Sequence, residues 1–181
     1  RDYVAGAVRE WAAERVGDKG SVVTIDLNEP MLRIGLEKIR RRNIRPFCAL
    51  GNAERLPLQD RSVDAVLTGF CLRNVSDLDR ALGEIYRVLK PGGRMVCLEF
   101  SRPTRPSLRR LYDFYSFTLL PKIGTWISRD RTGVYRYLPD SIRRFPDQEE
   151  LKRRMEKIGF RAVSYQNLSG GIVAIHVGEK P

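Results

Sequence analysis

Apolar residues fall in two patterns that alternate through the first hundred positions of the chain. Short runs of consecutive apolar residues predict strands, whereas segments with apolar residues three or four positions apart predict helices. The predicted strands are Val22–Ile25, Phe47–Leu50, Val63–Thr68 and Met95–Phe100. The predicted helices are Ala5–Val16, a segment from Asn28 to about Arg41, and Asp77–Leu89. This alternation favours an α/β fold with a mostly parallel sheet and helical crossovers.

The segment Arg87–Ser101 combines a helix end, a turn and a strand. Lys90 suits a helix C-terminus, and Pro91-Gly92-Gly93 predicts that the helix stops and the chain turns. The strand that follows is apolar on both faces, which is typical of parallel sheets covered by helices. We expect this strand to be buried and to bring the acidic residue Glu99 to its carboxyl end.

The chain changes character after Ser101, where prolines separate helical pieces rich in aromatic residues. The stretch from about 103 to 141 is too long for an ordinary connection and predicts a helical lid or substrate-binding insertion. Asp147 is expected to cap a helix that runs to Ile158. The last two strands, Ala162–Leu168 and Ile172–Val177, predict an antiparallel hairpin at the sheet edge. We expect one domain over residues 1–181.

The formal net charge of +11 predicts attraction to polyanions. Nucleic acid is not expected as the partner, because the arginine clusters lack the interleaved aromatic residues of single-strand binding grooves. An anionic membrane face or a phosphorylated substrate stays open. No apolar run reaches the roughly 20 residues that cross a bilayer. Three widely spaced cysteines favour a cytoplasmic protein and give no zinc-ligand spacing.

Polar residues at two predicted strand ends suit a nucleoside. Asp26 can accept hydrogen bonds from both hydroxyls of a ribose, although a turn or capping role explains an aspartate there equally well. The Asn52-Ala53 turn can read the edge of adenine, while Leu27 and Met31 can pack on its faces. The alternative for Asn52 is an ordinary Gly-Asn turn.

Four stretches resemble the class I S-adenosylmethionine-dependent methyltransferases, and more narrowly the ubiquinone/menaquinone biosynthesis C-methyltransferase family. They are TIDLNEPML, GNAERLPLQDRSVDAV, FCLRNVSDLDRALGEIYRVLKPGGRMVCLEFS, and YDFYSFTLLPKIG followed by YRYLPDSIRRFPDQEEL. The resemblance implies a Rossmann-like sheet and methyl transfer from S-adenosylmethionine to a ring carbon of a polyprenylated benzoquinol or naphthoquinol. It also implies that Asp26 binds the ribose, that Asn52 and Ala53 bind the adenine, and that Gly69 lies beside the cofactor.

The chain departs from this family in two respects. Gly69 stands where the family commonly has serine, so only a backbone contact is expected there. The family's first strand, which occupies the middle of the sheet, and its glycine-rich loop are not found in the sequence. We therefore expect the chain to be N-terminally incomplete, with unpaired backbone groups on both neighbouring strands.

Ring methylation needs an ionised quinol, and Arg73 is the first candidate to stabilise the phenolate, although a surface or capping arginine explains this position equally well. Tyr112, Asp113 and Tyr115 can bind ring oxygens from the lid, although aromatic residues at helical spacing also suit simple packing. His176, the single histidine, is expected to be structural because it falls within the last strand.

The expected partners are a prenylated quinol and, peripherally, the anionic inner face of a membrane. A homodimer is compatible with the sequence. The alternatives to quinol methylation are a class I methyltransferase that acts on another lipid or small molecule, a catalytically incomplete fragment, and a binding protein without catalysis. A nicotinamide-dependent oxidoreductase is a more distant alternative.

Overall fold

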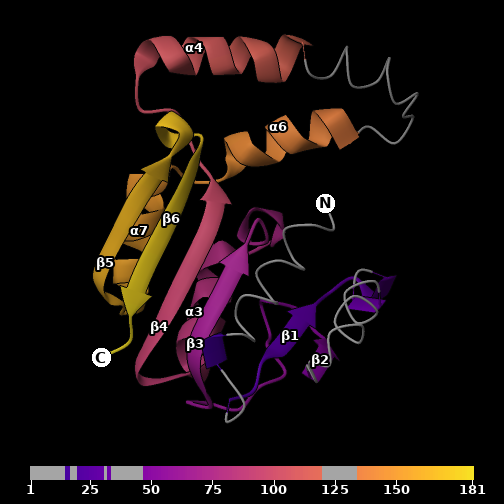
Figure 1. Ribbon diagram of the computed structural model, residues 1–181, viewed down its shortest axis with the longest axis vertical. Helices are drawn as coiled ribbons and strands as arrows, with labels where there is room; N and C mark the ends of the chain where they lie inside the picture. Colours follow the sequence, from indigo (N-terminus) through magenta and orange to yellow (C-terminus); the bar gives the residue numbers. More distant parts are fainter. Residues whose placement is uncertain (1–14, 17–19, 31, 34–46, 120–133) are drawn as a thin grey trace.

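The computed structural model describes residues 15–16, 20–30, 32–33, 47–119 and 134–181 (Figure 1). Most of the two predicted N-terminal helices, 5–16 and 28–41, lies outside these residues. Helical backbone is described at residues 15–16, 29–30 and 32–33, and the Leu32 amide donates to the Asn28 carbonyl oxygen over 3.1 Å. The start of the second predicted helix is therefore correctly placed.

The described strands form two sheets instead of one. The first contains β1 (Val23–Asp26) and β2 (Phe47–Leu50), which run parallel. The second has the order β3-β4-β6-β5, in which β3 and β4 are parallel and β6 is antiparallel to both of its neighbours. No described residue supplies a strand that joins the β1-β2 sheet to the β3-β4-β6-β5 sheet.

The unit β3 (Val63–Gly69), α3 (Leu78–Val88) and β4 (Leu89–Phe100) is the crossover that the apolar pattern predicts. The Asp77 side chain caps α3 by accepting a hydrogen bond from the Arg80 amide over 3.0 Å. The buried face of α3 consists of Ala81, Leu82, Ile85 and Val88. Their spacing of three and four residues explains why the helix lies against the sheet.

The Pro91-Gly92-Gly93 segment differs from its prediction, because it lies within β4 and not before it. Leu89 pairs with Val63 and Arg94 pairs with Ala65, so the glycines form an irregularity in one continuous strand. Gly92 adopts φ +76°, a conformation that favours glycine. The Gly92 amide donates to the Lys180 carbonyl oxygen (2.8 Å), and the Lys180 amide donates to the Gly93 carbonyl oxygen (2.9 Å). Backbone groups near the C-terminus thus supply the hydrogen bonds of the irregular segment.

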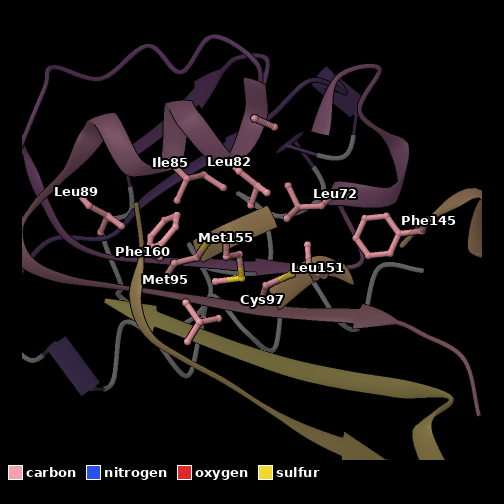
Figure 2. Close-up of a cluster of buried hydrophobic side chains, with 12 residues drawn as sticks. Leu72, Leu82, Ile85, Leu89, Met95, Cys97, Phe145, Leu151, Met155 and Phe160 are labelled. Carbon is pink, nitrogen blue, oxygen red and sulfur yellow. The ribbon is translucent and has the colours of Figure 1, made fainter. Parts of the chain in front are cut away.

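The C-terminal part forms the predicted antiparallel hairpin of β5 (Arg161–Leu168) and β6 (Val173–Glu179). Helix α7 (Gln148–Ile158), capped by Asp147, covers the same sheet face as α3 (Figure 1). Between these helices and the sheet lies the apolar core (Figure 2). It includes Leu82, Ile85, Met95, Cys97, Leu151, Met155 and Phe160.

Two helices lie beyond the carboxyl ends of β3 and β4 (Figure 1). They are α4 (Pro106–Phe114), which continues into the π-helical turn η2 (Tyr115–Leu119), and α6 (Val134–Arg144). Helix α4 and the turn η2 fall within the predicted 103–141 insertion, whereas α6 extends three residues beyond it, to Arg144. Residues 120–133 of the insertion lie outside the described part. Among the described residues, no helix is long and apolar enough to cross a membrane.

Candidate active site

The carboxyl ends of β1 and β2 bring Asp26 and Asn52 to the same edge. Asp26 pairs with Leu50 in the parallel register, and the Gly51 amide donates to the Asp26 carbonyl oxygen over 3.1 Å. The two strand ends are thus joined directly, which is the adjacency that a shared nucleoside site requires. Leu27 follows Asp26 and is 70% exposed, so an apolar surface stands open beside the carboxylate.

Local hydrogen bonds fix both polar side chains. Asp26 Oδ1 accepts from the Asn28 amide over 2.9 Å, and Asn52 Oδ1 accepts from the Glu54 amide over 2.9 Å. Each bond closes a short turn without a ligand, so the turn roles considered from the sequence are present. The same bonds hold the remaining carboxylate oxygen and the exposed Asn52 amide nitrogen in defined positions.

Gly69 ends β3 beside open space, since a Cβ added there would meet no atom within 4 Å. The next turn contains Cys71, whose thiol has a raised pKa. Partial desolvation is the largest cause, followed by the carboxylates of Glu99 and Asp26.

Arg73 lies in the 3-10 turn η1 (Leu72–Asn74) and pairs with Glu99 at the end of β4. Arg73 Nη1 is 3.2 Å from Glu99 Oε2, and the two side chains are 10% and 1% exposed. The same nitrogen donates to the Phe70 carbonyl oxygen over 2.6 Å, and the guanidinium carbon lies 5.2 Å from the Phe100 ring centroid. Arg73 Nε is buried and has no hydrogen-bond partner among the residues that the structure describes.

Burial raises the pKa of the Glu99 carboxyl, and Arg73 acts in the opposite direction. Glu99 also accepts from the backbone amides of Arg73 (3.3 Å) and Phe100 (3.2 Å). The sequence analysis identified Glu99 as an acidic strand end but missed its pairing with Arg73. Residues 26 positions apart carry no local signal for such a contact.

A cavity of about 170 Å³ lies between α4, α6 and the chain after β4. Tyr112 and Asp113 line it, whereas Tyr115 does not and is 48% exposed. Burial raises the pKa of the Tyr112 hydroxyl. Other lining residues include Ser101, Arg102, Arg109, Ser116 and Arg143. None of the predicted cofactor residues lines this cavity.

The turn that carries Arg73 is also joined to the helices beyond the sheet. The Tyr137 hydroxyl of α6 donates to Asn74 Oδ1 over 2.9 Å. The sequence analysis did not predict this contact, because Tyr137 and Asn74 are 63 positions apart. The hydrogen bond places the N-terminal part of α6 beside η1.

His176 lies away from these groups, within β6 and under α7. Its Nε2 is 2.9 Å from the Gln148 carbonyl oxygen, and burial lowers the pKa of its ring. This environment agrees with the structural role expected from the sequence. Within the described ranges, no three His, Cys, Asp or Glu side chains gather as metal ligands would.

A network that the sequence analysis missed holds the loop after Asn52 against α3. Arg87 donates to the carbonyl oxygens of Leu56 (3.1 Å) and Leu58 (2.9 Å). Arg87 Nη1 also lies 2.6 Å from Asp60 Oδ1, and Arg87 Nε lies 2.8 Å from Glu84 Oε1. The pKa of Arg87 is raised, first by Glu84, and the pKa of Glu84 is lowered, first by Arg87.

Comparison with known sequences gives the family. The profile described as the ubiE/COQ5 methyltransferase family matches residues 3–180. The chain belongs to this family. The chain is therefore a class I methyltransferase sequence. The methyl donor of this family is S-adenosylmethionine.

Curated relatives extend this match. The chain is 46% identical over 187 residues to the ubiquinone/menaquinone biosynthesis C-methyltransferase UbiE of Idiomarina loihiensis, covering 98% of this chain and 72% of the relative. It is 50% identical over 167 residues to the UbiE protein of Vibrio cholerae, covering 91% and 64%. The chain therefore spans about two thirds of the length of these relatives.

Solved structures agree on the fold. A S-adenosylmethionine-dependent methyltransferase of Aquifex aeolicus superposes with a TM-score of 0.69 at 20% identity, covering 98% of this chain and 78% of the other. A Haemonchus contortus phosphoethanolamine N-methyltransferase, crystallised with S-adenosylmethionine, gives 0.68 at 16% identity, covering 98% and 46%. These similarities confirm the predicted Rossmann-like class I fold.

Proposed function

We propose that the protein that carries this chain transfers a methyl group from S-adenosylmethionine to a ring carbon of a polyprenylated quinol. The acceptor would be demethylmenaquinol, the corresponding benzoquinol of ubiquinone biosynthesis, or both. Family membership and the UbiE relatives support this reaction. The observation that carries the proposal is the direct junction of the Asp26 and Asn52 strand ends.

On the cofactor side, we assign the ribose to Asp26 and the adenine to Leu27, Asn52 and Ala53. A carboxylate at a strand end suits a diol, and an exposed leucine suits a purine face. The open space beside Gly69 leaves room for the cofactor. When bound, S-adenosylmethionine supplies an electrophilic methyl group on a sulfonium centre.

On the acceptor side, we assign Arg73 to the ionised ring oxygen. A guanidinium lowers the pKa of a nearby phenol because it favours the charged form. The aromatic rings of Phe70 and Phe100 hold this cation in place, together with Glu99. We assign the quinol to the cavity lined by Tyr112 and Asp113, and Tyr115 to its outer rim. Arg73 does not line this cavity, and the Tyr137–Asn74 hydrogen bond joins its turn to α6, which borders the cavity. In this proposal residues 103–141 form the substrate-binding insertion of a single domain.

The proposal also includes the setting in which the protein works. A prenyl tail keeps the acceptor in a membrane, so we expect a cytoplasmic protein that binds peripherally to an anionic membrane face. We do not expect nucleic acid as a partner. Self-association as a homodimer is compatible with the proposal.

The test uses labelled S-adenosylmethionine with demethylmenaquinol and the matching benzoquinol as acceptors. It is run on the 181-residue chain and on any longer protein that contains it. Label in the quinol is expected, and Arg73→Ala should lower turnover while leaving cofactor affinity nearly unchanged. Label in another lipid acceptor, with none in either quinol, would contradict the substrate assignment.

A further inference from the structure

Helix α4 carries an exposed apolar stripe. None of its residues is buried, and Leu111 and Phe114 are 65% and 55% exposed. Arg110 shares this side, because positions 107, 110, 111 and 114 follow the i, i+3, i+4, i+7 spacing of one helix face. Tyr112 points the other way, into the cavity between α4 and α6.

The position of α4 leaves this stripe uncovered by other described elements. Figure 1 shows α4 as the outermost helix, with α6 between it and the sheet. Exposed leucine and phenylalanine side chains on one helix face are typical of surfaces that meet another apolar phase. The question is therefore which partner has the chemistry to cover them.

The charges around the stripe identify that partner. Arg110 lies on the stripe and Arg105 directly precedes the helix, and both side chains are exposed. Arg102, Arg109 and Asp113 line the cavity on the other side of α4. Arginines beside leucine and aromatic residues on a short helix match an interface between apolar acyl chains and anionic phosphates. A neutral protein surface would leave the positive charge without a counterpart.

We propose that α4 is the element that docks this protein on an anionic lipid surface. Leu111 and Phe114 enter the boundary between headgroups and acyl chains, and Arg105 and Arg110 bind lipid phosphates. The inference rests on the proposed function in one respect: a prenylated acceptor gives the protein a reason to meet lipid. Because Tyr112 and Asp113 lie on the inner side of the same helix, docking also brings the cavity to the membrane that holds the acceptor.

The test is cosedimentation of the chain with vesicles of phosphatidylcholine, alone or mixed with phosphatidylglycerol. The chain should bind the mixed vesicles at least about tenfold more tightly, and added salt should weaken this binding. The variant Leu111→Ser/Phe114→Ser should lose about tenfold or more in affinity, and Arg105→Glu/Arg110→Glu should lose at least as much.

Matched controls carry equally exposed side chains elsewhere. Phe47→Ser lies on β2, where Phe47 is 67% exposed, and Arg94→Glu and Arg153→Glu alter exposed charges on β4 and α7. These variants should change vesicle binding less than about threefold. Equal losses in the controls would overturn the proposal, since binding would then follow total charge and total exposed apolar area.

Two further readouts separate the competing explanations. Sedimentation velocity measures association: if Leu111→Ser/Phe114→Ser turns a dimer into a monomer with vesicle binding unchanged, a second copy covers the stripe and the proposal is wrong. Methylation of a short-tailed, water-soluble quinol by a longer protein tests the proposed function alone. Retained turnover in the α4 variants with lost vesicle binding supports docking. If the unaltered protein binds vesicles but does not methylate the quinol, only the quinol reaction is contradicted.

Discussion

The buried pair Arg73–Glu99 gives the sharpest test of the energetics at the strand ends. The perturbation is a double-mutant cycle made of Arg73→Met, Glu99→Leu and the combined variant. Each single change leaves one charge in a site where the side chains are 10% and 1% exposed. Breaking a buried ion pair by removing one partner costs about 3 to 5 kcal/mol.

The two single changes differ in what the remaining group can do. In Glu99→Leu the Arg73 cation keeps the Phe70 carbonyl and the rings of Phe70 and Phe100, so we expect a loss of about 3 kcal/mol. In Arg73→Met the carboxyl can take up a proton, because its pKa is already raised, and we expect a loss of about 2 kcal/mol. The combined variant leaves no buried charge and should lose clearly less than the sum.

The assay is urea unfolding followed by far-ultraviolet circular dichroism, with the slope of each transition compared among variants. A coupling free energy of at least about 2 kcal/mol is expected. The control is Arg94→Met/Glu179→Leu on β4 and β6, whose pair is 2.7 Å long but 66% and 40% exposed. Its coupling should stay below about 1 kcal/mol. Additive losses at Arg73 and Glu99 would refute the reasoning.

Four further predictions concern other parts of the chain. Asp26→Ala should weaken S-adenosylmethionine binding measured by calorimetry in a longer protein that binds it, and unchanged affinity would remove Asp26 from the site. Lys180→Met should destabilise the fold by about 2 kcal/mol in urea, because the buried ammonium donates to the carbonyl oxygens of Tyr86 (2.7 Å) and Leu89 (2.8 Å) at the end of α3; an unchanged midpoint would contradict that role. Burial lowers the pKa of His176 in the folded protein, so the imidazole takes up a proton more readily in the unfolded chain. The free energy of unfolding should therefore fall as the pH drops through about 6.5, the pKa of an unperturbed histidine. The variant His176→Phe should lose this part of the pH dependence of stability. Arg87→Ala should speed amide hydrogen exchange in residues 56–60, and unaltered exchange there would mean that the loop is held by other contacts.

Much of the fold could be predicted where the signal lies within a few residues. The caps Asp77 and Asp147 precede their helices, and Phe47–Leu50 is a short apolar run between polar segments, so local patterns give these elements. The adjacency of Asp26 and Asn52 was also predictable, because carboxyl ends of neighbouring parallel strands meet at one edge.

The rest depends on contacts between distant residues. The Pro91-Gly92-Gly93 segment continues a strand because β3 and Lys180 supply its hydrogen bonds, which no local pattern contains. Tyr115 shares a helical pattern with Tyr112, but the face of a helix that meets a cavity is set by tertiary packing. The Arg73–Glu99 pair could not be predicted for the same reason, because the two residues meet only where the turn after β3 packs against the end of β4.

The carboxylate of Glu54 links the turn at Asn52, to which we propose adenine binds, to the start of α3. Glu54 Oε1 accepts from the backbone amides of Ser76 (2.6 Å) and Asp77 (3.2 Å), immediately before α3, and Glu54 itself follows Asn52 by two residues. Movement of Glu54 away from α3 would leave the backbone amides of Ser76 and the cap residue Asp77 without this acceptor, so the turn at Asn52 is tied to the start of the helix. A nucleoside that binds there meets a turn whose conformational entropy was already lost when the helix folded.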